Sequence, residues 1–177
     1  ASTGTQTSRA NCHPFRYGRW LFMYNGAIGG YDQVRHRLDL LIDPALYPGR
    51  AGTTDSETFF YLLLGNGLEE DVEGAFARTL AIVVAVMDEA EISVPFHMTA
   101  VLSDGARVHA LPWSNDKKSP TLFLGQRCFG AARGSESEAM VILSEPLDSN
   151  RESWMTVPES HLLGAEGSDV AVKPFAL

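Results

Sequence analysis

The hydrophobic pattern of this chain changes its period once, near Pro95, and the change limits the folds that the chain can adopt. Before Pro95, most apolar residues recur three or four positions apart, which is the spacing of one helix face. After Pro95, short apolar runs alternate with turn residues, as in a series of strands. Helices followed by strands favour an α+β fold over alternating strand–helix units around a parallel sheet.

The expected elements follow from this pattern. Two or three helices occupy the first half: one carries the apolar positions from Val34 to Ile42, one starts at Thr54 and ends near the left-handed cap Gly65-Asn66-Gly67, and one runs from Leu68 to Ala90. We expect a buried strand at 19–24 that enters a tight turn at Asn25-Gly26. The further strands are expected at 96–102, 107–111, 121–124, 139–143, 154–157 and 169–172, with a hairpin turn at Asp104-Gly105.

Composition narrows the class of protein. The chain has 177 residues and is 45% hydrophobic, so we expect one domain, 1–177, with a real core. A net charge of -8 with few lysines argues against nucleic acid, because phosphate binding needs clustered Lys and Arg. The absence of a long apolar stretch or a leader predicts a cytoplasmic protein with no membrane partner. Two cysteines form no disulfide framework, and without metal-ligand spacings we predict no metal and no cofactor.

The sequence Thr54-Asp55-Ser56-Glu57 is typical of a helix start. Thr54 can cap the free N–H groups, and Glu57 can reach back to complete a capping box. Asp55 would lie in the first turn, where the helix dipole favours its ionised form. Such a carboxylate either only stabilises the helix end or holds the ammonium group of a substrate.

The dipeptide Asn25-Gly26 also has two interpretations. By itself, Asn-Gly most often marks a hairpin turn. Alternatively, the Asn25 amide and the Gly26 N–H point at a developing oxyanion, with glycine allowing the substrate to approach the backbone.

Cys12 next to His13 superficially suggests a thiolate–imidazole pair. However, sequence neighbours rarely face each other correctly, and Pro14 imposes an extended turn. We therefore interpret Cys12 as a structural, partly buried thiol.

Taken in order, these segments resemble the class II glutamine amidotransferases, and most closely a stand-alone branch that includes the γ-glutamyl hydrolase of ergothioneine biosynthesis. Each motif alone is weak, but the ordered set runs through almost the whole chain. The resemblance rests on Asn11-Cys12-His13-Pro14-Phe15, Trp20, Asn25-Gly26-Ala27-Ile28, Thr54-Asp55-Ser56-Glu57, Ser144-Glu145-Pro146-Leu147-Asp148, Trp154 and Val157-Pro158.

The resemblance implies an N-terminal-nucleophile (Ntn) hydrolase-like αββα sandwich, with two antiparallel sheets between helix layers. In that family an N-terminal cysteine attacks the glutamine amide, with its own α-amino group as general base. Asn25 and Gly26 match the oxyanion hole, and Asp55 matches the residue that binds the α-amino group of glutamine. Thr3 matches the threonine of an Arg-x-x-Thr segment that helps to hold the α-carboxylate.

Two departures from the family pattern stand out. The nucleophilic cysteine and the arginine are not in this chain, which we interpret as missing the opening strands; neither Cys12 nor Cys128 can substitute, because neither has a free α-amino group. The family also commonly has histidine before Asn-Gly, whereas this chain has Tyr24. Tyrosine can still donate a hydrogen bond and pack its ring, so we expect retuned geometry rather than lost function.

The sequence therefore predicts a glutaminase-type amidohydrolase that acts on glutamine, with a nucleophile outside this chain, which alone would be inactive. One alternative is hydrolysis of a γ-glutamyl conjugate. A second is a non-catalytic member or fragment that binds glutamine-like ligands. A separate synthase or acceptor subunit is a possible partner, because no acceptor domain is present in the sequence.

Overall fold

The computed structural model describes residues 6–129, 137–148, 150 and 153–177. Three α-helices lie in the first half of the chain: α1 (Tyr31–Leu40), α2 (Asp55–Gly65) and α3 (Val72–Glu89). Two short 3-10 helices precede α1 and α2, at Arg9–Asn11 and Tyr47–Gly49. Within the described residues, no helix has the length and apolar character needed to cross a membrane.

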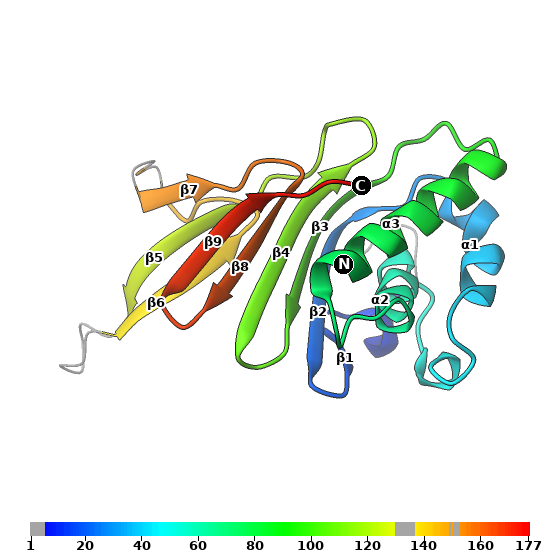
Figure 1. Cartoon of the computed structure of the whole chain (residues 1–177), viewed down its shortest axis with the longest axis horizontal. Coiled ribbons are helices and arrows are strands. Elements are labelled where there is room, and N and C mark those ends of the chain that lie inside the picture. The colour runs from blue at the N-terminus through cyan, green and yellow to red at the C-terminus, as the bar shows by residue number, and fades with distance from the viewer. Residues whose placement is uncertain (1–5, 130–136, 149, 151–152) are drawn as a thin grey trace.

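The strands form two antiparallel sheets (Figure 1). The six-stranded sheet has the order β1-β2-β3-β4-β8-β9, and the three-stranded sheet has the order β6-β5-β7. The bounds are β1 (Phe15–Tyr17), β2 (Trp20–Ala27), β3 (His97–Ser103), β4 (Arg107–Ser114), β5 (Phe123–Phe129), β6 (Ser137–Leu143), β7 (Trp154–Thr156), β8 (His161–Glu166) and β9 (Asp169–Pro174).

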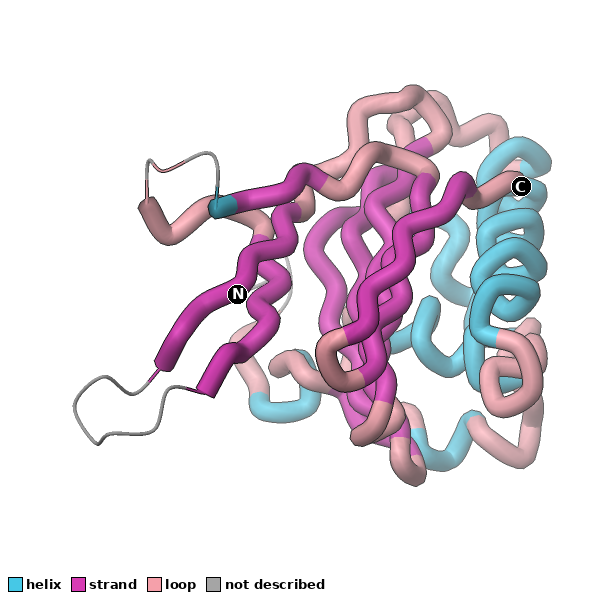
Figure 2. Tube along the Cα trace, turned by 60° about the vertical axis from the view of Figure 1, so that its left-hand side comes forward, coloured by secondary structure: helices cyan, strands magenta, loops and turns pink. Residues whose placement is uncertain are grey.

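The α-helices cover one face of the six-stranded sheet, and the three-stranded sheet lies on the other side (Figure 2). The larger core fills the helix side, where the rings of Phe22, Phe59 and Phe60 are fully buried. A smaller core lies between the sheets and includes Leu124, Val157 and Leu163. Each layer thus buries its apolar face against the next, as a layered domain requires.

The expected α+β fold with two antiparallel sheets is confirmed. The α-helices of the described residues form a single outer layer, so the second helix layer of the expected αββα sandwich is not part of this structure. The Asp104-Gly105 turn is confirmed as well: Asp104 Oδ1 accepts the N–H groups of Ala106 and Arg107 at 3.0 and 2.7 Å. Strands β1 and β8 are not predicted from the sequence.

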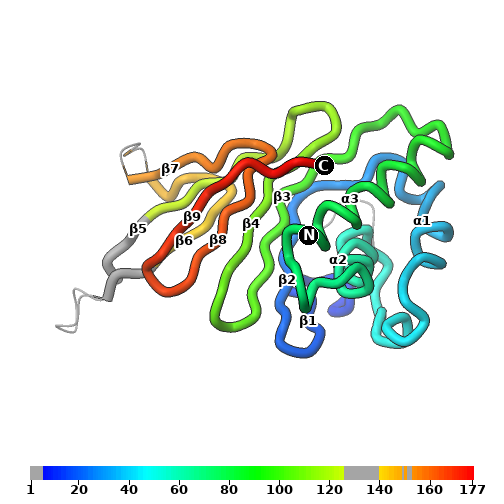
Figure 3. Tube along the Cα trace, in the orientation of Figure 1, coloured from blue at the N-terminus to red at the C-terminus, as the bar shows by residue number. Residues whose placement is uncertain are grey.

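Strand β2 connects the early and late parts of the chain. Although 69 residues lie between them in the sequence, β2 and β3 lie side by side (Figure 3), with Asn25 opposite Thr99 and Gly26 opposite Met98. The expected tight turn at Asn25-Gly26 is wrong, because the strand continues through both residues to Ala27. The burial of β2 alternates, so Phe22 and Tyr24 face the helices while Asn25 is exposed.

Gly26 is fixed by its neighbour in β3. It adopts a φ of +147°, and a Cβ atom placed there would lie 2.0 Å from the carbonyl oxygen of His97. The backbone of β3, rather than a ligand, is therefore sufficient to explain the glycine at this position.

We predict that Gly26→Ala lowers the free energy of unfolding by at least about 3 kcal/mol, because the methyl group meets backbone that cannot move aside. Gly18→Ala is the matched control, since Gly18 also has positive φ (+56°) but no heavy atom within 4 Å of an added Cβ. It should cost about 1 kcal/mol, from the left-handed backbone alone. Urea denaturation measures both, and equal losses would contradict the proposed clash.

Candidate functional site

Only one of the two predicted capping contacts is present at the start of α2. Thr54 Oγ1 accepts the N–H of Glu57 at 3.2 Å, and the helix begins at Asp55. The predicted return bond from Glu57 to the Thr54 N–H is wrong. The Glu57 carboxylate instead accepts the N–H groups of Ala51 and Gly52 at 2.9 and 2.7 Å. Because Glu57 is buried, these two donors satisfy a carboxylate that has left water.

The Asp55 carboxylate joins the two motifs that the sequence singles out. Its Oδ1 accepts the N–H of Ser56 at 2.8 Å, and its Oδ2 accepts the N–H of Ile28 at 2.9 Å. Ile28 directly follows the last residue of β2. The helix start is thereby held against the end of the strand that carries Asn25 and Gly26.

The sequence predicts that the helix start favours the ionised form of Asp55, but the pKa of its carboxyl is shifted in the opposite direction. Burial raises the pKa of the Asp55 carboxyl above its ordinary value, and the backbone N–H groups of Ile28 and Ser56 oppose that rise without cancelling it. Burial penalises a charged group more strongly than the end of a short helix stabilises it. Asp55 is therefore a carboxylate whose ionised form gains from a nearby positive charge.

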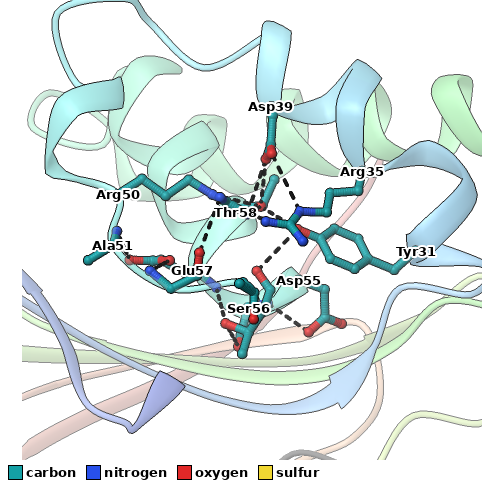
Figure 4. Close-up of polar contacts among 12 residues, drawn as sticks. Tyr31, Arg35, Asp39, Arg50, Ala51, Asp55, Ser56, Glu57 and Thr58 are labelled. Atoms are coloured by element: carbon teal, nitrogen blue, oxygen red, sulfur yellow. Dashed lines mark hydrogen bonds and ion pairs between the residues drawn. The ribbon is translucent and has the colours of Figure 1, made fainter. Parts of the chain in front are cut away.

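Behind Asp55 lies a buried polar cluster centred on Arg50, which Figure 4 shows between α1 and α2. Its guanidinium forms an ion pair with Asp39 Oδ1 at 3.2 Å, and its Nη2 donates to Thr58 Oγ1 at 2.7 Å and to Tyr31 Oη at 3.1 Å. The Arg50 side chain is only 5% exposed, and that of Asp39 14%. The same arginine donates to the carbonyl of Gly52 at 3.3 Å, which fixes the loop that leads into α2.

The Asn11 segment closes the other side of this loop. Asn11 Oδ1 accepts the N–H of Thr53 at 2.8 Å, and Asn11 Nδ2 donates to the Gln6 carbonyl at 2.9 Å. Cys12 is exposed rather than partly buried, and its thiol lies 3.3 Å from the carbonyl oxygen of Ser8. In the sequence motif that begins at Asn11, the asparagine is thus the residue that contacts the site.

The predicted site residues have different outcomes. Asp55 contacts the N–H of Ile28, which directly follows β2 and lies three residues after Asn25. Thr3 lies outside the described residues. Arg50, Asp39 and Thr58 were not predicted. An arginine in a Gly-rich loop and an aspartate on a helix usually face water, and only the threonine directly before an apolar run hinted at a buried polar partner.

A half-buried carboxylate such as that of Asp55 has the chemistry to bind a positively charged group. The Asn25 amide and the Gly26 N–H, both on β2, precede Ile28 in the sequence by three and two residues. Among the described residues, no three His, Cys, Asp or Glu side chains come together as a metal site would require.

This α+β fold with two antiparallel sheets is similar to that of solved glutamine amidotransferase structures. A glutamine aminotransferase class-II domain protein from Silicibacter pomeroyi is 33% identical, with a TM-score of 0.82 over 96% of this chain and 73% of that one. The chain therefore belongs to the glutamine amidotransferase-like family.

Two other known proteins are also similar to this chain. A predicted glutamine amidotransferase from Pseudomonas aeruginosa shares the fold, with 23% identity and a TM-score of 0.59 over 93% of this chain and 66% of that one. The probable glutamine amidotransferase DUG3 of Saccharomyces cerevisiae is 25% identical over 99% of this chain, which spans 57% of the yeast protein. No family model matches the sequence.

The Arg50–Asp39 pair yields a stability prediction. Asp39→Asn should lower the free energy of unfolding by about 3 kcal/mol, because it leaves a buried guanidinium without its counter-charge. Glu166→Gln is the control: it breaks the Arg107–Glu166 pair, whose side chains are 58% and 61% exposed, and should cost less than about 1 kcal/mol. Denaturant titration compares them, and similar losses would show that the Arg50 cluster contributes no more than a surface pair.

Proposed function

We propose that this chain carries the substrate-recognition part of a class II, Ntn-type glutaminase, which hydrolyses the side-chain amide of glutamine. The observation that supports this best is the 2.9 Å contact between Asp55 Oδ2 and the Ile28 N–H, since it joins the two motifs. In the proposed reaction an N-terminal cysteine, which is not among these 177 residues, is the nucleophile.

The proposed roles follow the chemistry of amide cleavage. The cysteine sulfur forms a bond to the amide carbon, whose oxygen takes up the negative charge. The Asn25 amide and the Gly26 N–H stabilise that oxyanion. The C–N bond then breaks, ammonia leaves with the proton from the thiol, and water hydrolyses the thioester to glutamate. Asp55 holds the α-ammonium group, and Thr3 contacts the α-carboxylate.

A γ-glutamyl-conjugate hydrolase would use the same recognition groups, because its substrates carry the same α-ammonium and α-carboxylate. Only the leaving group differs, being an amine instead of ammonia. Assays of glutamine against γ-glutamyl amides in the full-length protein separate these two activities.

A non-catalytic protein that binds glutamine-like ligands is a further alternative. Such a protein would bind glutamate and glutamine by calorimetry but release no ammonia in any assay. A full-length protein with an exposed N-terminal cysteine and measurable turnover would exclude it.

Asn25→Ala tests the oxyanion role. In the full-length protein, we expect kcat for glutamine to fall by about 10²–10³-fold, as on loss of one oxyanion donor. Asn25 is exposed, so the fold should survive the substitution. Gln33→Ala, which removes an exposed amide from α1, is the control and should leave kcat unchanged. Full kcat in Asn25→Ala would show that this side chain does not stabilise the oxyanion.

Asp55→Ala tests the ammonium contact. We expect a higher KM with little change in kcat, because the contact is equally strong in the ground state and the transition state. The matched control is Asp32→Ala, which removes the exposed first-turn acid of α1. The parent affinity should also fall on acidification, and at a higher pH than for an ordinary aspartate, because burial raises the Asp55 pKa. An unchanged KM in Asp55→Ala would refute this role.

A further inference from the structure

Tyr24 carries an unexplained polar group. Among the described residues, its hydroxyl is the one buried side-chain oxygen or nitrogen atom with no hydrogen-bond partner. The residue is only 8% exposed, and its ring packs near Phe22 and Phe59. Phenylalanine would fill the same space without burying an unpaired hydroxyl, so core packing alone does not account for a tyrosine here.

The hydroxyl lies in the electrostatic field of Asp55. Tyr24 is on the helix-facing side of β2, and four residues later the Ile28 N–H binds the Asp55 carboxylate. Burial, and after it the charge on Asp55, raise the pKa of the Tyr24 hydroxyl well above its ordinary value. Tyr24 therefore stays protonated at neutral pH and keeps a hydrogen-bond donor near this carboxylate.

Asp55 has capacity for another donor. Each of its oxygens accepts one backbone N–H, and a carboxylate oxygen can accept two hydrogen bonds. The neighbouring charged groups are already engaged: Glu57 with the loop N–H groups, and Arg50 with Asp39. No charged side chain shifts the pKa of Asp55 noticeably; the causes are burial and the backbone N–H groups.

We propose that Tyr24 is a positioning residue of the Asp55 subsite, whose hydroxyl donates a hydrogen bond to the Asp55 carboxylate when that carboxylate binds a ligand ammonium group. This inference rests on the proposed function of Asp55. Ammonium binding requires the fully ionised carboxylate, and a donor to the ionised form stabilises it. The subsite thereby favours ligands with a free α-ammonium group over those whose amine is acylated.

The test is Tyr24→Phe in the full-length protein. We expect unchanged or higher thermal stability, because the substitution removes a buried hydroxyl that has no partner in this structure. We expect KM for glutamine to rise about tenfold, with kcat within twofold of the parent. The acid limb of kcat/KM should stay in place, because it reports the free enzyme, in which the Tyr24 hydroxyl has no partner. Calorimetry with glutamate should show the same tenfold loss in affinity.

Two further variants test the donor itself. Tyr61→Phe removes another phenol from the same aromatic cluster and should leave KM and the pH profile unchanged. Tyr24→His keeps an N–H donor, so KM should stay within a few-fold of the parent. A large gain in kcat/KM in Tyr24→His, or a Tyr24→Phe variant that behaves like Tyr61→Phe, overturns the inference.

Asp55→Ala distinguishes failure of the proposed function of Asp55 from failure of the positioning role of Tyr24. If that variant leaves KM and glutamate affinity unchanged, the proposed function of Asp55 fails, and with it the basis for Tyr24. If Asp55→Ala weakens binding while Tyr24→Phe does not, the ammonium site stands and only the positioning role of Tyr24 is refuted.

Discussion

The buried guanidinium of Arg50 holds together the part of the molecule on which the candidate site depends. It binds Asp39 on α1, Thr58 on α2 and the Gly52 carbonyl of the connecting loop. A charge this deeply buried is tolerated only when each of its hydrogen bonds is made, so the three segments have one compatible arrangement. That arrangement holds the start of α2 over the end of β2, where Asp55 meets the Ile28 N–H.

Gly52 contributes to the same arrangement, because its lack of a side chain lets the neighbouring segments approach the loop closely. A Cβ on Gly52 would lie 2.5 Å from Asn11 Oδ1 and 2.6 Å from the Ala10 carbonyl oxygen. The loop before α2 is thus pressed between the Asn11 segment and the helix. The position of Asp55 is set from three directions: by the loop, by α1 and by β2.

What the sequence predicted well was local. The α2 start follows from Thr54 and its neighbours, because capping involves residues only three apart. The Glu57 partners could not be predicted this way, since the loop N–H groups become available only after the loop folds back. Arg50 was missed for the same reason: its partners come from α1 and α2, and nothing adjacent in sequence indicates that it is buried.

Non-local pairing explains the other errors. Asn-Gly favours a turn, but at Asn25-Gly26 the pairing with β3 outweighs that preference and the strand continues. Strand β8 was missed because its sequence, His161–Glu166, alternates weakly and gains its strand form from β4 and β9 on either side. The pKa of Asp55 was misjudged because burial cannot be read from the helix start alone.

The alternation of side chains along β2 gives neighbouring residues separate surroundings. Tyr24 belongs to the aromatic core beneath the helices, whereas Asn25 is exposed and points to the opposite face. Substitutions in the core could therefore adjust how firmly a ligand is held without disturbing the other face. Conversely, a single inserted residue within β2 would exchange the two environments at once. The length of the strand is thus more tightly constrained than the identity of any one residue that has no part in the site.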